Sequence, residues 1–147
     1  MKCLLTISLL LGLFAGNAAA APSICKKEPL ACNVYFESRG EKEKGQYAVA
    51  FVSVNRLKNG SYGQSMRSVV FSKGQFSWTN SRGKINDPEA WAKAREIARN
   101  VHHWSKDDKL YRKKDLTRGA LYFRKEGTSV QWNKKVVARI GKHIFYA

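Results

Sequence analysis

Acidic residues are scarce in this sequence of 147 residues. It has 11 Asp and Glu against 27 Lys and Arg, which gives a formal net charge of +16. This imbalance indicates an anionic partner, such as nucleic acid, a membrane surface or an acidic polymer. Hydrophobic residues make up 44% and aromatic residues 12%, which is enough for a packed core and argues against a disordered basic tail. The length fits one domain.

Several organising features are also missing. The sequence has no internal repeat, no proline-rich linker and no low-complexity run. It has no glycine-rich phosphate loop, no His-Glu-x-x-His motif and no Gly-x-Ser-x-Gly elbow. The adjacent His102 and His103 would diverge on a helix rather than share a metal. Zinc, nucleotide and serine-nucleophile enzymes are therefore poorly supported, and we expect no metal and no cofactor.

The N-terminus has the pattern of a secretory signal peptide. It starts with a positive charge, continues with an apolar run from Leu4 to Phe14, and has small residues at Ala18 and Ala20. The apolar run is shorter than the roughly 20 residues that span a membrane. We therefore predict a signal peptide over 1–20 that is cleaved. The alternative is a signal anchor that is released slowly.

Export would change which partner the positive charge is expected to bind and which state the cysteines are expected to have. Residues 21–147 keep a net charge of +15, because one lysine leaves with the signal peptide. They would act beyond the inner membrane, in the periplasm or outside the cell, where nucleic acid is not an expected partner. Cys25 and Cys32 are seven residues apart, which favours a local disulfide in an oxidising compartment. The alternative is a thiol nucleophile paired with a histidine.

Hydrophobic periodicity predicts helices first and strands later. Apolar residues at helical spacing predict three helices, over 30–39, 46–58 and 87–101. The second is apolar on nearly all sides and should be central in the core. Residues 61–83 should be mostly loop. Short apolar runs predict strands over 119–124 and 129–132 around a turn at Glu126-Gly127, and a third strand with its approach over 136–146. This order is typical of an α+β domain.

Positive charge is concentrated toward the C-terminus, where residues 102–147 carry +8. Lysines and arginines there alternate with aromatic residues such as Tyr122 and Trp132. This pattern can bind a polymer by stacking and charge. For any single lysine, a solvated surface position is the better explanation.

Glu37 is the most informative of the few acids. It follows the apolar and aromatic run Val34-Tyr35-Phe36. A carboxyl group packed against such side chains is desolvated, which raises its pKa. Glycosidic cleavage requires an acid that stays protonated near neutral pH and can protonate the leaving group. The alternative is an ion pair at the helix end with Arg39 or a lysine.

Several motifs follow one another along the chain. They are Cys32-Asn-Val-Tyr-Phe-Glu-Ser-Arg-Gly-Glu41, Gly45-Gln-Tyr-Ala-Val-Ala50, Val54-Asn-Arg56, Val69-Val-Phe71, Gly74-Gln-Phe-Ser-Trp78, Gly119-Ala-Leu-Tyr-Phe123, Trp132 and Ile140-Gly-Lys-His-Ile-Phe-Tyr146. Together they cover essentially 30–146, and their order resembles that of the SleB/CwlJ-type cell wall hydrolases. Exported members of that family often have a cysteine near the position of Arg67. This sequence has none there, so the family's disulfide pairing cannot be carried over.

The resemblance implies a lysozyme-like α+β single domain over 21–147, with a helical core and a small antiparallel sheet. It also implies cleavage of peptidoglycan between N-acetylmuramic acid and N-acetylglucosamine. The implied enzyme is a lytic transglycosylase that forms 1,6-anhydro products, with Glu37 as general acid and then base. A muramidase-type hydrolase would need a second carboxylate. Glu41 is the nearest in sequence, but a structural or substrate-orienting role suits it better.

The remaining motif positions are predicted to bind substrate or to shape the cleft. The predicted substrate-binding residues are Glu41, Gln75, Phe76, Trp78, Tyr122 and His143. Core packing explains Phe76 equally well, and a structural role is favoured for His143.

The expected partner is peptidoglycan, with anionic lipid or lipopolysaccharide as a further surface, and a monomer is expected. Cell wall remodelling and phage lysis by an endolysin both fit these features. The alternative from a different class is an exported cationic protein that binds the wall or disrupts membranes, as antimicrobial proteins do, on an inactive hydrolase fold.

Overall fold

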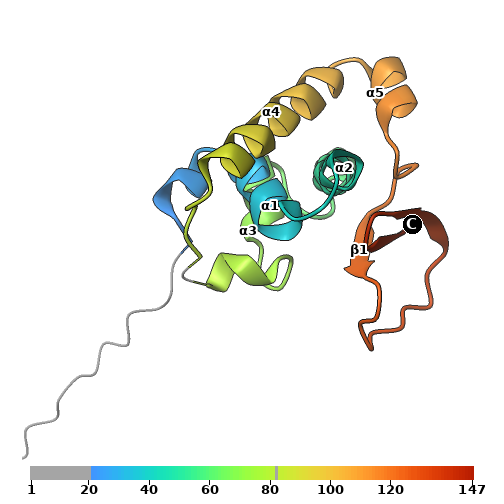
Figure 1. Cartoon of the computed structure of the whole chain (residues 1–147). Helices are drawn as coiled ribbons and strands as arrows, with labels where there is room; N and C mark the ends of the chain where they lie inside the picture. The colour runs from blue at the N-terminus through green and yellow to red at the C-terminus, as the bar shows by residue number, and fades with distance from the viewer. Residues whose placement is uncertain (1–20, 82) are drawn as a thin grey trace, which may run out of the picture.

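The structure is a computed structural model that describes residues 21–81 and 83–147 (Figure 1). The predicted signal peptide over 1–20 lies outside the described residues. In chain order the elements are η1 (Ser23–Lys26), α1 (Pro29–Ser38), α2 (Glu43–Asn59), α3 (Met66–Phe71), η2 (Ser77–Asn80), α4 (Pro88–Trp104), α5 (Asp108–Lys114), β1 (Tyr122–Lys125), β2 (Val136–Ile140) and β3 (His143–Tyr146). Helices precede strands, which confirms the predicted α+β class.

Helix α2 lies between the other helices and the sheet (Figure 1). Seven consecutive residues from Ala48 are each at most 3% exposed. On one side, Ala50 and Phe51 belong to a cluster that also contains residues of α1 and α4. Ala48 and Val52 pack with Phe145 of β3 in a second cluster. The prediction that α2 is central is therefore confirmed, because helices α1 and α4 pack on one side of it and the sheet packs on the other.

The predicted ends of two helices are confirmed. The Asp87 carboxylate accepts a hydrogen bond from the backbone N–H of Ala90 at 2.9 Å, and Pro88 occupies the first turn of α4. Such a cap satisfies a backbone donor that the helix itself leaves free. Gly60, with φ of 79°, ends α2 in the left-handed region that favours glycine.

Two short helices go beyond the sequence-based prediction. Helix α3 lies in the segment expected to be mostly loop, and it opens with a reciprocal cap between Ser65 and Ser68. Helix α5 opens with Asp107, whose side chain accepts two backbone N–H bonds. Both starts use ordinary capping residues. Hydrophobic periodicity did not reveal them because each helix is at most seven residues long.

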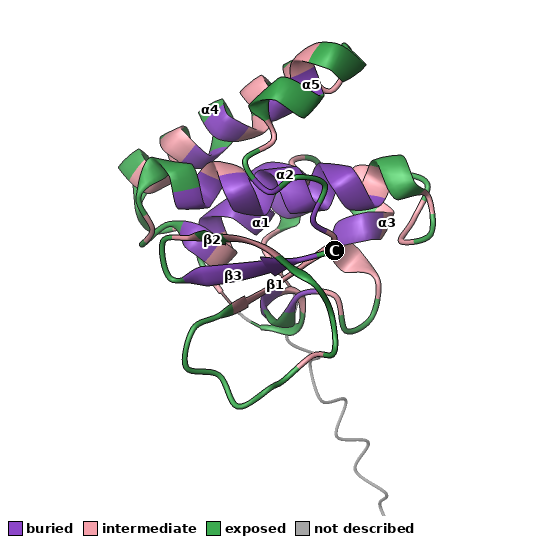
Figure 2. Cartoon of the chain, turned by 90° about the vertical axis from the view of Figure 1, so that its right-hand side faces the viewer, coloured by how far each residue is buried: buried purple, intermediate pink, exposed green. Residues whose placement is uncertain are grey.

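The sheet has three antiparallel strands in the order β1-β3-β2. Its central strand, β3, is buried along its whole length (Figure 2). Strands β2 and β3 form a hairpin across Gly141 and Lys142, where Gly141 has φ of 58°. Strand β1 pairs with the other side of β3 and places Tyr122 opposite Tyr146.

The strand predicted over 129–132 is wrong. The turn predicted at Glu126-Gly127 is present, but it leads into a loop rather than into a second strand. This part of the chain is an exposed loop (Figure 2), in which Val130 is 49% exposed. The segment predicted as one strand with its approach, 136–146, is instead two strands. The physical reason is burial, because β3 is covered on both faces and therefore takes the centre of the sheet.

The disulfide expected from the cysteine spacing is present. Cys25 in η1 and Cys32 in α1 are bonded, with their Cα atoms 5.5 Å apart. Both residues are fully buried, together with Val70, Phe76 and Trp78. The bond attaches η1 to α1, and it leaves Cys32 no free thiol to act as a nucleophile.

Candidate active site

Glu37 lies in the last turn of α1 and lines a cleft of about 400 Å³. The cleft is formed by α1, α2, the loops around Tyr62 and Gln75, and β1 with the loop that follows it. Its lining residues are Glu37, Arg56, Tyr62, Gly74, Gln75, Phe76, Ser77, Tyr122, Phe123 and Trp132. Segments far apart in the sequence therefore meet around one carboxyl group.

The surroundings of Glu37 favour its neutral form. Burial raises its pKa above the ordinary value of 4.5, while the charges of Lys125 and Arg56 act in the opposite direction. None of the ion pairs among the described residues includes Glu37. The guanidinium of Arg39 lies over the ring of Tyr35, 4.9 Å from its centre. The alternative of a helix-end ion pair is therefore not formed, and the geometry suits a general acid.

Arg56 is a cleft residue that no sequence-based site prediction included. It is only 6% exposed. Its Nε donates to the Leu121 carbonyl at 2.7 Å and its Nη1 donates to Gln75 Oε1 at 3.0 Å. Its guanidinium also lies 5.2 Å from the centre of the Phe76 ring. The available signal was an arginine close to the apolar run 48–54 of α2, because a charge in a buried part of a helix needs specific partners.

Aromatic side chains form a wall of the cleft. The Tyr62 hydroxyl donates to the Tyr122 hydroxyl at 2.5 Å. The Trp132 ring meets the Tyr122 ring edge-on at 6.0 Å between centres. Lys134 Nζ lies 4.0 Å from the centre of the Tyr122 ring. Partial burial and the bond to Tyr122 raise the pKa of Tyr62 to about 12, so the Tyr62 hydroxyl keeps its proton at neutral pH.

Three of the predicted substrate-binding residues share the cleft with Glu37. They are Gln75, Phe76 and Tyr122. Phe76 is only 4% exposed and contacts Phe123 as well, so it combines a core position with a cleft position. Their contact with substrate remains a prediction.

Trp78 is buried and is not among the residues that line the cleft, so its contact with substrate stays a prediction. It is 7% exposed, and its Nε1 donates to Asn33 Oδ1 at 2.8 Å. Its ring stacks on Phe36 at 4.8 Å between centres. In this arrangement Trp78 supports α1, which carries Glu37.

Glu41 and His143 join the α1–α2 loop to the β-hairpin. The carboxylate of Glu41 accepts the backbone N–H of Lys142 at 3.0 Å. His143 is 1% exposed, and its ring meets Phe123 edge-on. Burial lowers the pKa of His143 despite the charge of Glu41. Both side chains contact protein in this conformation, and their binding to substrate remains a prediction.

The described residues contain no group of three or more His, Cys, Asp or Glu side chains that could hold a metal ion. Over the same part of the chain, none of the helices has the length and apolar character needed to cross a membrane.

Comparison with known proteins identifies relatives of the chain. A model of the cell wall hydrolase family matches residues 40–146, a stretch that starts three residues after Glu37. The spore cortex-lytic enzyme of Bacillus cereus is 31% identical over 115 residues, which is 76% of this chain and 40% of that protein. The enzyme of the same name from Bacillus subtilis is 31% identical over 124 residues, which is 79% of this chain and 35% of that protein. The match thus spans well under half of these relatives.

Two solved structures share the fold. The catalytic domain of the Bacillus cereus SleB protein superposes with a TM-score of 0.63 and 27% identity, covering 92% of this chain and all of that domain. The catalytic domain of the germination-specific lytic transglycosylase SleB from Bacillus anthracis has a TM-score of 0.57 and 27% identity, covering 86% of this chain and 98% of that domain. The chain therefore belongs to the cell wall hydrolase family and has the lysozyme-like fold of the SleB catalytic domains.

Proposed function

We propose that this protein cleaves the glycan strands of peptidoglycan between N-acetylmuramic acid and N-acetylglucosamine, with Glu37 as general acid and base. The observation that carries the proposal is the half-buried Glu37 carboxyl, with its raised pKa, in a cleft walled by aromatic rings. Amphipathic sugar rings stack on aromatic faces while their hydroxyls find hydrogen-bond partners. Family membership supports the same substrate.

Lytic transglycosylation is the outcome that we propose. Glu37 gives its proton to the glycosidic oxygen, and the bond to the muramic C1 breaks as positive charge develops there. The C6 hydroxyl of the same sugar then attacks C1 and gives its proton back to Glu37, which closes a 1,6-anhydro ring. No water is consumed, and the carboxyl group returns to its starting state.

The lining of the cleft supports this outcome over hydrolysis. Hydrolysis with two carboxylates needs a second acid close to the first. Among the described residues that line the cleft, Glu37 is the only acid. Glu41, the nearest acid in sequence, has its carboxylate engaged with the hairpin. The name of the Bacillus anthracis relative, a lytic transglycosylase, points the same way.

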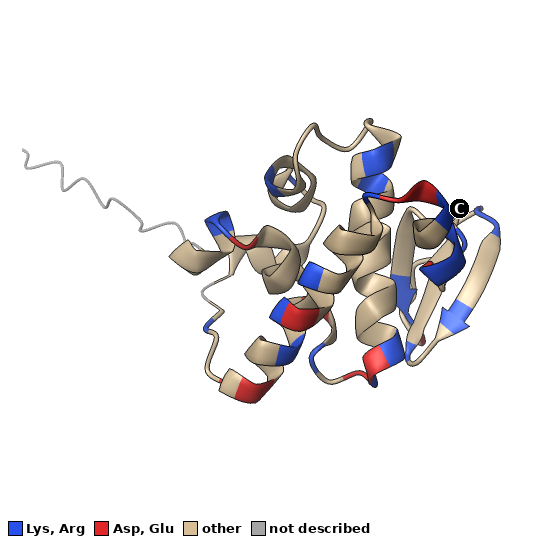
Figure 3. Cartoon of the chain, turned by 90° about the horizontal axis from the view of Figure 1, so that it is seen from above, with Lys and Arg blue, Asp and Glu red and all other residues tan. Residues whose placement is uncertain are grey.

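We further propose that the protein is exported and acts as a monomer in the periplasm or outside the cell. The pattern of residues 1–20 supports export. The net charge of +15 that remains on 21–147 suits an anionic surface, such as the wall, anionic lipid or lipopolysaccharide. Lysines and arginines are distributed over both the helices and the sheet (Figure 3). Wall remodelling and phage lysis both remain compatible with this location.

Digestion of purified sacculi tests the proposed function. Wild type should release muropeptides that end in anhydro-muramic acid, read by mass. Glu37→Gln should lose at least a hundredfold in rate, since it cannot transfer the proton. Glu43→Gln is the matched control, because it removes an exposed carboxylate from the start of α2 and should retain activity. Intact glycan with wild type, accompanied by membrane leakage that Glu37→Gln retains, would favour the inactive cationic protein instead.

A further inference from the structure

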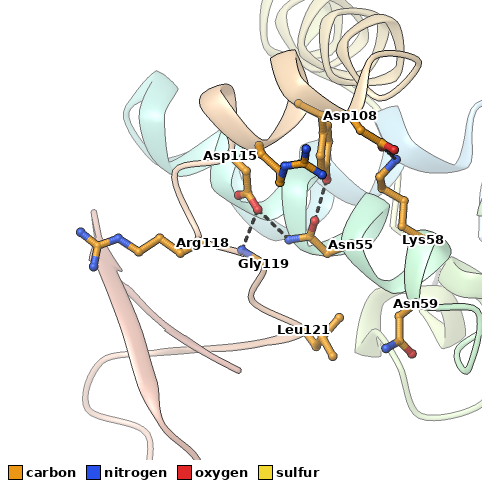
Figure 4. Close-up of a pocket in the computed structure, with 10 residues that line it drawn as sticks. Asn55, Lys58, Asn59, Asp108, Asp115, Arg118, Gly119 and Leu121 are labelled. Atoms are coloured by element: carbon orange, nitrogen blue, oxygen red, sulfur yellow. Dashed lines mark hydrogen bonds and ion pairs between the residues drawn. The ribbon is translucent and has the colours of Figure 1, made fainter.

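A second cavity lies beside the Glu37 cleft, where the end of α2 meets α5 and the segment that leads to β1 (Figure 4). Its volume is about 620 Å³. It is lined by Asn55, Lys58, Asn59, Asp108, Tyr111, Arg112, Asp115, Arg118, Gly119 and Leu121. We propose that this cavity binds a carboxylate of the peptide branch of peptidoglycan while the glycan occupies the cleft. The proposal rests on the proposed function and extends it to a second part of the same substrate.

The acceptors in the floor of the cavity are already occupied. Asp115 Oδ1 accepts the backbone N–H and the hydroxyl of Thr117, at 2.8 and 2.7 Å. Asp115 Oδ2 accepts Asn55 Nδ2 at 3.0 Å and the Gly119 N–H at 2.8 Å. The side-chain oxygen of Asn55, Oδ1, accepts the Tyr111 hydroxyl at 2.8 Å. The bonds of Asp115 to Asn55 and Gly119 are drawn in Figure 4. With these acceptors engaged, the floor has few left for a cationic ligand.

The rim of the cavity offers donors instead. Among the described residues, neither Arg112 nor Arg118 has a carboxylate within 4.0 Å or a side-chain hydrogen bond. Lys58 is paired with Asp108 at 2.7 Å. Arg118 extends away from the other labelled side chains (Figure 4). Its φ of 55° is unusual for a residue with a Cβ and turns the chain sharply at this point. Arg112 is therefore the free guanidinium at this rim, and it is the group that can bind a carboxylate in a bidentate manner. Asp108, the nearest acid of the lining, is already paired with Lys58.

The cavity and the cleft share one backbone segment. Leu121 lines the cavity and the next residue, Tyr122, lines the cleft. On α2, Asn55 faces the cavity and Arg56 faces the cleft. Arg56 fastens the segment by its bond to the Leu121 carbonyl. A peptide of four extended residues reaches about 13 Å. In the proposed binding mode, a branch of this length must pass from a sugar in the cleft across this segment to the cavity.

The chemistry of the substrate selects the peptide branch as the ligand. The amino sugars of a glycan strand are uncharged, whereas the short peptides attached to the muramic residues end in a carboxylate. Attachment to a glycan already in the cleft gives the carboxylate a high effective concentration at the cavity. Even a single charge-assisted pair can then lower KM.

Two glycan substrates of equal length test the inference. One keeps its peptides. The other has been stripped of them by an amidase, and the lactyl carboxylates that this exposes have then been converted to amides, so that its sugars stay uncharged. Wild type should show a higher kcat/KM on the substrate with peptides, mainly through KM, and Arg112→Gln should reduce this preference roughly five- to tenfold. Lys109→Gln removes the same charge from the same helix but lies outside the cavity lining, so it should keep the preference.

A binding measurement makes the result independent of cleavage. The free muramyl peptide should shift NMR signals of Asn55 and Gly119 in the wild type, and the same peptide with its C-terminus amidated should not. A wild type that cleaves both substrates equally, or a preference unaltered in Arg112→Gln, overturns the inference and leaves the proposed function intact. A wild type that cleaves neither substrate overturns the proposed function, and this inference with it.

Discussion

At the scale of a single residue, Glu37 combines a fixed position in the cleft with a raised pKa. It is placed by the last turn of α1, and burial keeps its carboxyl protonated to a higher pH than an exposed glutamate. The opposing charges of Lys125 and Arg56 limit this rise. Those charges would also stabilise the carboxylate after it has given up its proton, so the site suits a group that must act first as acid and then as base.

The rate of cleavage should depend on pH through Glu37. Because the first step needs the protonated acid, kcat/KM should fall as pH rises through the raised pKa of this residue. Lys125→Gln removes a charge that lowers this pKa, so the falling limb should move to higher pH. A pH profile of both proteins on one soluble glycan measures this. An unmoved limb would contradict the electrostatic account.

The Glu37 carboxyl that catalysis needs should lower the stability of the fold at neutral pH. The pKa of Glu37 is higher in the folded state than its ordinary value of 4.5. The contribution of Glu37 to stability is therefore fully present when the pH is below 4.5, and it is lost as the pH rises through the folded-state pKa. Glu37→Gln should therefore be more stable than wild type at neutral pH and similar to it in acid. Urea denaturation at both pH values measures the difference. Equal stability at neutral pH would indicate that the carboxyl is not desolvated.

Glu37 could be predicted from the sequence because an acid after an aromatic run is unusual and the surrounding motif is specific. Arg56 could not be assigned to the site, since its partners Gln75 and Leu121 are brought to it only by tertiary packing. Tyr62 was missed for the same reason, because its partner Tyr122 is 60 residues away.

At the scale of elements, the β2–β3 hairpin packs against the α1–α2 loop and is hydrogen-bonded to it. Gly141 sits in the turn with φ of 58°, and a Cβ there would collide with the Glu41 carboxylate. That carboxylate in turn accepts the Lys142 N–H. The close approach explains why this turn carries a glycine beside a glutamate from another part of the chain.

Gly141→Ala should destabilise the fold by about 2–3 kcal/mol, through its left-handed backbone and the collision together. Gly127→Ala is the matched control. It also has a positive φ, of 78°, but nothing lies within 4 Å of an added Cβ, so about 1 kcal/mol is expected. Urea denaturation gives both free energies. The excess cost at Gly141 should largely vanish in a Glu41→Ala background, and an excess that persists there would rule out this contact as its cause.

The helices could be predicted from the sequence better than the sheet. Apolar spacing and capping residues are local signals, and they placed α1, α2 and α4 close to their observed ranges. Strand pairing is not local. The central position of β3 depends on its burial against α2, and the apolar character of 129–132 suggested a strand that the structure replaces with an exposed loop.

At the scale of the whole molecule, the charge of 21–147 should control affinity for the wall. Long-range attraction is screened over about 10 Å at 0.1 M salt and about 3 Å at 1 M. Binding of Glu37→Gln to sacculi, which separates binding from cleavage, should therefore weaken steeply as salt rises. Pelleting assays at a series of salt concentrations measure this. Affinity that is unchanged by salt would mean that the cleft alone provides the binding.

The central claim is that Glu37 performs a transglycosylation in which the sugar's own hydroxyl replaces water. Digestion of sacculi in heavy-oxygen water, followed by mass spectrometry of the muramic ends, tests it most directly. The account predicts ends that lack heavy oxygen and are lighter than hydrolysed ends by one water molecule, with none formed by Glu37→Gln. Reducing ends that carry the heavy oxygen would contradict it and show hydrolysis.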